Sequence, residues 1–174
     1  GIAVQSVTVN VVDGVLTLAQ NGGFEDAGDT PEKAAIWVGK KLVANKDQRV
    51  CNTVEEPDLA FAGACAFRFN APAKGATVAR KLQQVFNTPL WGAKGDVLTV
   101  TAQLRGLKVK SGAKVAIQVV YNNNTKKNIA IAVPTGTYDY TFAERTLTLT
   151  RRVKKVTLVV NVGKPAGRSG WTTS

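Results

Sequence analysis

Residues 97–104 of this chain read Val97-Leu98-Thr99-Val100-Thr101-Ala102-Gln103-Leu104, so that apolar residues alternate with polar ones. Alternation with a period of two is typical of a β-strand that buries one of its faces. Further strand candidates lie at residues 2–11, 114–121, 129–133, 138–142, 146–150 and 153–162. Turn residues such as Asp13-Gly14 and Asn122-Asn123-Asn124 separate them. The chain is therefore predicted to be all-β, as an antiparallel sandwich.

Length and composition indicate one globular domain. The chain has 174 residues, of which 44% are hydrophobic and 20% charged, so one core of ordinary size is expected. No apolar run approaches the roughly 20 residues that cross a bilayer, so no membrane span is predicted. Only residues 32–41 and 77–86 have a pattern compatible with short helices. The first residue, Gly1, is interpreted as a processed N-terminus or as the edge of a longer sequence.

The chain contains no histidine. Catalytic triads with an imidazole base and most zinc sites are therefore excluded. The sequence has no phosphate-binding loop, dinucleotide fingerprint or nucleophile-elbow motif. The carboxylates that a glycosidase would need gather in the first 58 residues without a recognisable frame. The sequence predicts that the protein is not an enzyme.

The formal net charge is +11, and it is unevenly distributed. Residues 1–58 hold nine acids and five bases, a sum of −4, whereas residues 59–174 hold 18 bases and three acids, a sum of +15. Such asymmetry favours binding to a polyanion or head-to-tail self-association. A solvated, lysine-rich surface explains the same counts and stays open as an alternative. No nucleic-acid-binding pattern accompanies the charge, so nucleic acid is not expected as the partner.

Several blocks of the sequence occur in a characteristic order. They are Asn21-Gly22-Gly23-Phe24-Glu25, Gly63 to Asn70, Leu82-Gln83-Gln84, Gly95 to Val100, Lys114 to Tyr121, Val133 to Tyr140, and Lys155 to Val160. Their order and spacing resemble the galactose-binding-domain-like jelly roll of bacterial extracellular carbohydrate-binding modules. The resemblance implies a jelly-roll β-sandwich, outside the cell or on its surface, that binds a polysaccharide or glycan without catalysis. The basic second segment makes an anionic glycan a candidate ligand.

The resemblance covers residues 16–174, which we assign to the module. Residues 1–15 are left as an extra N-terminal strand or linker. Modules of this type usually finish on an acidic strand that follows a Ser-Gly pair and an aromatic residue. Here Ser169-Gly170-Trp171 is followed by only three residues, so the closing strand is expected to be absent.

The glutamate of the opening motif contributes a carboxylate to a buried calcium ion in similar modules, and calcium favours oxygen ligands. The resemblance therefore implies a structural calcium at Glu25. The other side-chain ligand often lies in the closing strand. The alternative is an exposed carboxylate in a loop that also holds Asp26 and Asp29.

Sugar-binding sites need flat aromatic faces with polar groups around them. The candidates are Trp37, Trp91, Tyr121 and Tyr138. Trp91 lies in a turn, where it can form a surface platform, whereas Trp37 lies in an apolar run that favours a core position. Tyr121 ends a strand beside three asparagines, so it either lines a cleft or caps the sheet.

Two cysteines, Cys51 and Cys65, lie 14 positions apart in strand-like sequence. In an extracellular protein they are expected to form a disulfide. Two buried thiols are the alternative.

The segment 2–11 is the best alternating strand of the chain, with its apolar residues nearly on one face: Ile2, Val4, Val7, Val9 and Val11. It either folds back onto its own domain or completes the sandwich of a neighbouring copy by donor-strand complementation through residues 1–12. The second arrangement does not close on itself, so it would build a filament or surface layer. A structural subunit of that kind is the alternative function.

Overall fold

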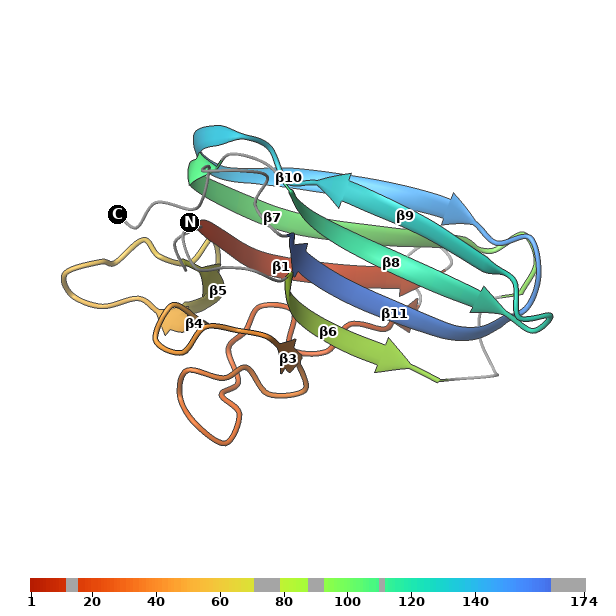
Figure 1. Ribbon diagram of the computed structural model, residues 1–174, viewed down its shortest axis with the longest axis horizontal. Helices are drawn as coiled ribbons and strands as arrows, with labels where there is room; N and C mark the ends of the chain where they lie inside the picture. The colour runs from red at the N-terminus through yellow and green to blue at the C-terminus, as the bar shows by residue number, and fades with distance from the viewer. Residues whose placement is uncertain (12–15, 71–78, 88–92, 110–111, 164–174) are drawn as a thin grey trace.

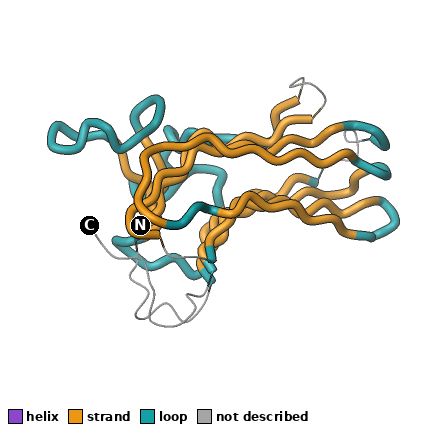
Figure 2. The backbone as a smooth tube through the Cα atoms, turned by 90° about the horizontal axis from the view of Figure 1, so that it is seen from above, coloured by secondary structure: helices purple, strands orange, loops and turns teal. Residues whose placement is uncertain are grey.

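The computed structural model describes residues 1–11, 16–70, 79–87, 93–109 and 112–163. All regular structure within these residues is β-strand, and the strands form two antiparallel sheets that pack face to face (Figures 1 and 2). The predicted all-β jelly-roll sandwich is therefore confirmed. No helix in the described part of the chain is long and apolar enough to cross a membrane.

The first sheet has the strand order β10-β7-β1-β5-β4, with β2 paired to β1. Its strands are β1 (Ile2–Val11), β2 (Leu16–Thr17), β4 (Asp47–Cys51), β5 (Cys65–Phe69), β7 (Val97–Val109) and β10 (Gly136–Thr148). The second sheet has the order β3-β6-β11-β8-β9. Its strands are β3 (Val38–Lys40), β6 (Arg80–Phe86), β8 (Ala113–Tyr121), β9 (Lys126–Ala132) and β11 (Val153–Val162).

Strand β1 is an inner strand of the first sheet, and Figure 1 shows it lying between β7 and β5. Ile2 pairs with Gly106 on one side and with Phe69 on the other. The strand expected from the sequence thus completes the sheet of its own chain, which is the intramolecular alternative. The sandwich accordingly begins before residue 16, the boundary expected from the sequence. The segment where a closing strand was sought, residues 164–174, lies outside the described residues.

A β-bulge explains the irregular spacing of the apolar residues in β1. The register with β7 shifts between Gln5 and Thr8, and Ser6 has a φ of 50°. A bulge adds one residue to the strand, so the apolar side chains after it point to the same face of the sheet as those before it. Ile2, Val4, Val7 and Val9 are therefore all at most 1% exposed and point into the core. Val11 pairs through its backbone with Leu98, and its side chain lies outside the described part of the structure.

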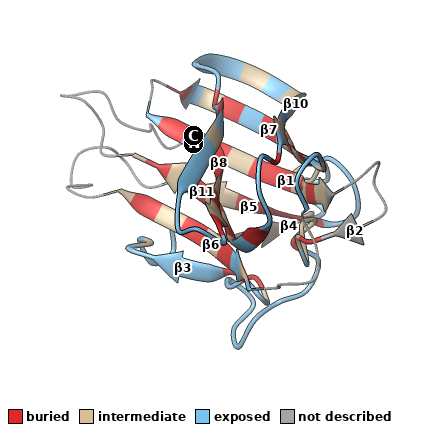
Figure 3. Ribbon diagram, turned by 90° about the vertical axis from the view of Figure 1, so that its right-hand side faces the viewer, coloured by how far each residue is buried: buried red, intermediate tan, exposed pale blue. Residues whose placement is uncertain are grey.

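The core fills the space between the two sheets. Its fully buried members include Phe24, Phe67, Phe69, Leu82, Leu98, Leu104, Ile117 and Leu158. One ion pair crosses this interior, because the Arg80 guanidinium on β6 bonds the Asp47 carboxylate on β4 and both side chains are buried. Burial of the two charges is tolerated because each neutralises the other. The edge strands β3 and β10 are mostly exposed (Figure 3).

The two segments compatible with helices contain strands instead. Residues 38–40 form β3 and residues 80–86 form β6. Along β6 the residues Arg80, Leu82 and Gln84 are buried, so the alternation of buried and less buried residues has a period of two. Pairing with β11 and β3 outweighs the favourable helix propensity of the intervening Lys and Gln residues.

Candidate functional site

A cleft of about 570 Å³ opens on the outer face of the first sheet, where β1 begins. Its walls come from the ends of β1 and β7, the start of β10, strands β4 and β5, and the loop 52–64 that joins those two strands. The residues with polar side chains that line it are Glu56, Arg68, Asn70, Arg105, Thr137, Tyr138 and Asp139. We call it the outer-face cleft.

The register of the sheet places two arginines on either side of an alanine. Ala3 of β1 pairs with Arg105 of β7 and, on its other side, with Arg68 of β5. Cross-strand neighbours point to the same face. A methyl group therefore lies between two long cationic side chains, and this difference in size leaves the floor of the cleft open.

Tyr138 also lines the cleft, and a glycine makes room for its ring, which packs against the core on the inner side of the sheet. Tyr138 pairs with Gly106 of β7, and a Cβ atom at Gly106 would collide with the ring. The phenol donates a hydrogen bond to the Pro134 carbonyl at 3.0 Å. Burial raises the pKa of Tyr138 to about 12. The ring is thus fixed beside the cleft with its hydroxyl group protonated.

The loop 52–64 forms the opposite wall, and a disulfide closes its base. Cys51 and Cys65 pair across β4 and β5 and are joined through their sulfur atoms, so the expected disulfide is confirmed. Glu56 and Leu59 of the loop face the cleft. A loop with tethered ends has fewer conformations to lose when its wall contacts a ligand.

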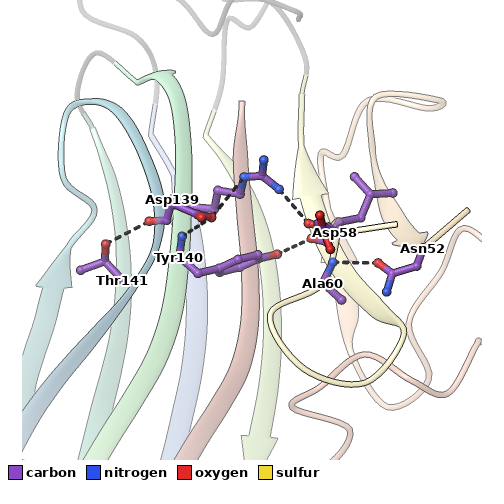
Figure 4. A network of polar contacts seen from close by, with 8 residues as sticks. Asn52, Asp58, Ala60, Asp139, Tyr140 and Thr141 are labelled. Atoms are coloured by element: carbon purple, nitrogen blue, oxygen red, sulfur yellow. Dashed lines mark hydrogen bonds and ion pairs between the residues drawn. The ribbon is translucent and has the colours of Figure 1, made fainter. Parts of the chain in front are cut away.

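Hydrogen bonds from β7 and β10 hold this loop against the sheet (Figure 4). The Tyr140 hydroxyl donates to the Leu59 carbonyl at 2.6 Å, and Arg105 Nη1 donates to the Asp58 carbonyl at 2.9 Å. The Phe61 ring also packs on the Tyr140 ring, with 5.7 Å between centroids. Burial under the loop raises the pKa of Tyr140 to about 12. The negative charge of Asp139 adds to this rise, and the positive charge of Arg105 opposes it.

A buried amide on β1 holds the same loop from beneath. Gln5 is 1% exposed, and its Nε2 donates to the Cys65 carbonyl at 2.6 Å and also to the Ala62 carbonyl. Its Oε1 accepts from the Ala62 amide at 2.8 Å. Buried polar groups require such partners. Gln5 therefore satisfies the backbone of the loop while filling the space below it.

The charges in the cleft are only partly neutralised. Arg105 lies 3.8 Å from the Asp139 carboxylate, in an exposed pair. In contrast, the buried Nε of Arg68 has no hydrogen-bond partner among the described residues. Burial, with repulsion from Arg68 and Arg80, lowers the pKa of the Gly1 amino group to about 6. Arg68 thus supplies positive charge and an unused donor at the cleft.

Of the four predicted sugar-binding aromatics, the three that the structure describes do not lie together. Tyr138 lines the outer-face cleft. Trp37 is 7% exposed, stacks on Phe24, donates its indole N–H to the Asn21 carbonyl, and borders a separate hollow of about 690 Å³. Tyr121 is buried at the far end of the sandwich, where its hydroxyl accepts from the Thr150 amide. Trp91 lies outside the described residues.

Three residues of the cleft were not singled out from the sequence: Arg68, Asn70 and Arg105. Arg105 lies far along the chain from Arg68 and Asn70, and it meets them because β1 pairs with both β5 and β7. One local signal was available. Gly106 interrupts an otherwise alternating strand, and an isolated glycine in a strand often marks the close approach of another group.

The predicted calcium site at Glu25 was tested against the surrounding geometry. Glu25 Oε1 accepts hydrogen bonds from the Ala64 and Cys65 amides at 3.0 and 3.1 Å. The Arg49 guanidinium donates to the carbonyls of Phe24, Glu25 and Pro31 at 2.6, 2.5 and 3.2 Å. No group of three or more possible side-chain ligands occurs among the described residues.

These residues do not fit a calcium ion. The carbonyl oxygens beside the Glu25 carboxylate already face a cation, the Arg49 guanidinium. A divalent ion at the same oxygens would be repelled by that charge. Arg49 joins the loop of residues 24–31 to β4 through these hydrogen bonds.

Comparisons with known proteins give only distant similarity. No protein-family model matches the chain, and no curated protein matches its sequence. Among solved structures, it is similar to the module TmCBM61 in complex with β-1,4-galactotriose, with 14% identity, a TM-score of 0.46, and coverage of 78% of this chain and 81% of that one. It is also similar to the enzymatically active domain of bacteriophage CBA120 tailspike protein 4, with 11% identity, a TM-score of 0.37, and coverage of 78% and 18%.

Proposed function

We propose that this chain is a non-catalytic, extracellular carbohydrate-binding module whose glycan lies in the outer-face cleft. The observation that carries the proposal is the convergence of Arg68, Asn70, Arg105 and Tyr138 on the lining of one open cleft. An aromatic ring can contact the apolar face of a sugar, and amide and guanidinium groups can bond its hydroxyl groups.

The unneutralised charge of Arg68 supports an acidic sugar as the ligand. Arginine binds carboxylate and sulfate groups with two parallel hydrogen bonds, and such bonds are stronger than those between neutral groups. Arg105 is already paired with Asp139, so Arg68 is the cation that a uronate would engage. We therefore propose a polysaccharide that contains uronic acid residues.

The disulfide supports the extracellular location. Disulfides form and persist in oxidising compartments and are rare in the cytosol. The bond between Cys51 and Cys65 closes a loop that forms a wall of the cleft, so the proposed binding site depends on an oxidised protein.

The test is calorimetric titration with polygalacturonan and with its fully methyl-esterified form, two polymers that differ only in whether the C6 carboxylate is free. We expect dissociation constants of about 10 μM to 1 mM, because an open cleft gains little over the cost of immobilising the ligand. The acidic polymer should bind at least about tenfold more tightly, which corresponds to 1.4 kcal/mol. Reducing-end assays should detect no cleavage of either polymer.

Variants locate the site. Tyr138→Ala should weaken binding to both polymers, whereas Arg68→Ala should remove the preference for the acidic one. Arg145→Ala is the matched control, because this arginine is exposed on β10 but does not line the cleft. Binding that survives Tyr138→Ala unchanged, or that is lost equally with Arg145→Ala, would place the glycan elsewhere.

A further inference from the structure

Two acidic loops lie together at one end of the long axis of the molecule, the end where β4 and β5 are found (Figure 1). They are residues 20–37 and 52–64, and the bonds from Glu25 to the Ala64 and Cys65 amides join them. Between them they hold seven acids and one base, namely Glu25, Asp26, Asp29, Glu32, Glu55, Glu56, Asp58 and Lys33. We call this the acidic end.

Three turns lie together at the opposite end of the long axis (Figure 1). The Asn122 amide donates to the Arg152 carbonyl, and the Gly95 amide donates to the Leu149 carbonyl, so backbone bonds hold the turns side by side. The basic end comprises residues 93–96, 121–127 and 149–155. It holds seven bases and one acid, namely Lys94, Lys126, Lys127, Arg151, Arg152, Lys154, Lys155 and Asp96.

The basic end contains a hollow of about 440 Å³. Two cationic residues and two amides line it: Arg152, Lys154, Asn87 and Asn122. No described carboxylate lines this hollow. Its lining is suited to acidic side chains, which accept hydrogen bonds from the side chains of all four of these residues.

The acidic end presents a well-anchored loop whose negative charge is complementary to the basic end. Glu55, Glu56 and Asp58 are exposed on the loop 52–64, which is held by the disulfide, Gln5, Tyr140 and Arg105. A preorganised loop loses little conformational entropy on binding. The same loop leaves Val54 94% exposed, so it also offers apolar area to a contact.

We propose that copies of this chain associate head to tail, with the acidic loop 52–64 of one copy against the basic end of the next. Each copy carries a net charge of +11, so copies repel one another in most orientations. Contact of the acidic end with the basic end brings opposite charges together and sets the orientation. Because the two surfaces lie at opposite ends, the contact repeats and forms a linear chain of copies. This contact needs no exchange of strands, so β1 stays in the sheet of its own copy.

The experiment is sedimentation velocity of the intact protein at about 50 mM and about 500 mM salt, across a range of protein concentrations. Low salt should give species larger than a monomer, and high salt should weaken association at least about tenfold by screening the contact. Two charge-reversed triple variants test the surfaces. The acidic-loop variant combines Glu55→Lys, Glu56→Lys and Asp58→Lys. The basic-end variant combines Arg151→Glu, Arg152→Glu and Lys154→Glu. Each variant alone should remain monomeric.

Mixing the two reversed variants is the decisive step. The reversed loop of the first variant faces the reversed basic end of the second, and their unreversed surfaces also match, so the mixture should associate again. The control reverses Lys40, Lys81 and Lys114 on the outer face of the second sheet, which changes the net charge as much as the basic-end variant does. It should still associate.

Near-ultraviolet circular dichroism checks that every variant is folded. A wild-type protein that stays monomeric at low salt would overturn the proposal, as would folded reversed variants that do not associate when mixed. A control that fails to associate would show that net charge, and not the two ends, governs the behaviour. No glycan is present in these experiments, so their outcome is independent of the proposed carbohydrate binding.

Discussion

The ring of Tyr138 on β10 lies directly against Gly106 on β7, at a position where any side chain larger than hydrogen would collide with it. The glycine therefore sets where the Tyr138 ring packs against the core, beside the outer-face cleft that Tyr138 also lines. This relationship ties the fold of the first sheet to the geometry of the proposed glycan site.

Gly106→Ala should both destabilise the protein and weaken glycan binding. Forcing an extra methyl group into a packed position typically costs about 1–3 kcal/mol. In a Tyr138→Ala background the collision with the ring is gone and only Val109 Cγ2, 2.8 Å from the added carbon, must shift, so the same substitution should cost markedly less. Urea unfolding of the two single variants and the double variant measures this coupling. Equal costs in both backgrounds would show that the ring does not lie against the glycine.

Alkaline titration should reveal two tyrosines that ionise late. Burial raises the pKa of Tyr138 and of Tyr140 to about 12, from the usual value of 10. The unfolded chain therefore loses these protons first, so the stability they contribute is present below pH 10 and is lost as the pH rises towards 12. Absorbance at 295 nm follows the phenolates. Tyr138→Phe and Tyr140→Phe should each remove one late step, and a titration complete by pH 11 would contradict the burial.

Reduction of the disulfide should destabilise the fold and loosen the cleft. For a loop closed by cysteines 14 residues apart, the chain-entropy estimate is about 3 kcal/mol. In a domain of this size that corresponds to a fall in Tm of about 6–12 °C. Calorimetry with and without reductant measures it, and the Cys51→Ser, Cys65→Ser variant is the control that reductant should not affect. Two titratable thiols in the unreduced, denatured protein would refute the pairing.

Chelators should leave the thermal stability unchanged, since Arg49 and not a metal bonds the carbonyls of Phe24 and Glu25. Arg49→Met should cost about 2–3 kcal/mol, because it leaves several carbonyl oxygens without a charged partner. Arg49→Lys should recover part of that loss. A Tm that falls in excess chelator, together with calcium found by elemental analysis, would restore the metal site predicted from the sequence.

The sequence predicted the sandwich because most strands bury one face, and burial on one face imposes alternation. Strand β10 was less evident, since it is an exposed edge strand and its residues 136–148 lack a clear apolar face. Strand β6 was read as compatible with a helix because Lys and Gln residues separate its buried positions. In both strands the pairing partner decides the structure, and the partner is remote in sequence.

The cleft was less predictable than the fold. Tyr138 was named as an aromatic candidate, but its neighbours Arg68 and Arg105 flank Ala3 only in the folded sheet. The position of β1 between β5 and β7 brings the two arginines to either side of Ala3. The sequence left open whether β1 pairs within its own chain. Their aromatic character alone did not distinguish Tyr138, which lines the cleft, from Tyr121, which is buried elsewhere. The burial of Tyr121 depends on the turn at residues 149–152, which is remote in the sequence.

The inner position of β1 also determines when the first sheet can form during synthesis. Ile2 pairs with Gly106, so the ribosome must add more than 100 residues before that partner exists. At about 5–20 residues per second, the apolar face of β1 waits on the order of 5–20 s for β7. Such long-range pairing slows folding and leaves a valine-rich strand unpaired in the nascent chain. Binding of that strand by a chaperone would protect it from aggregation until β7 has been made.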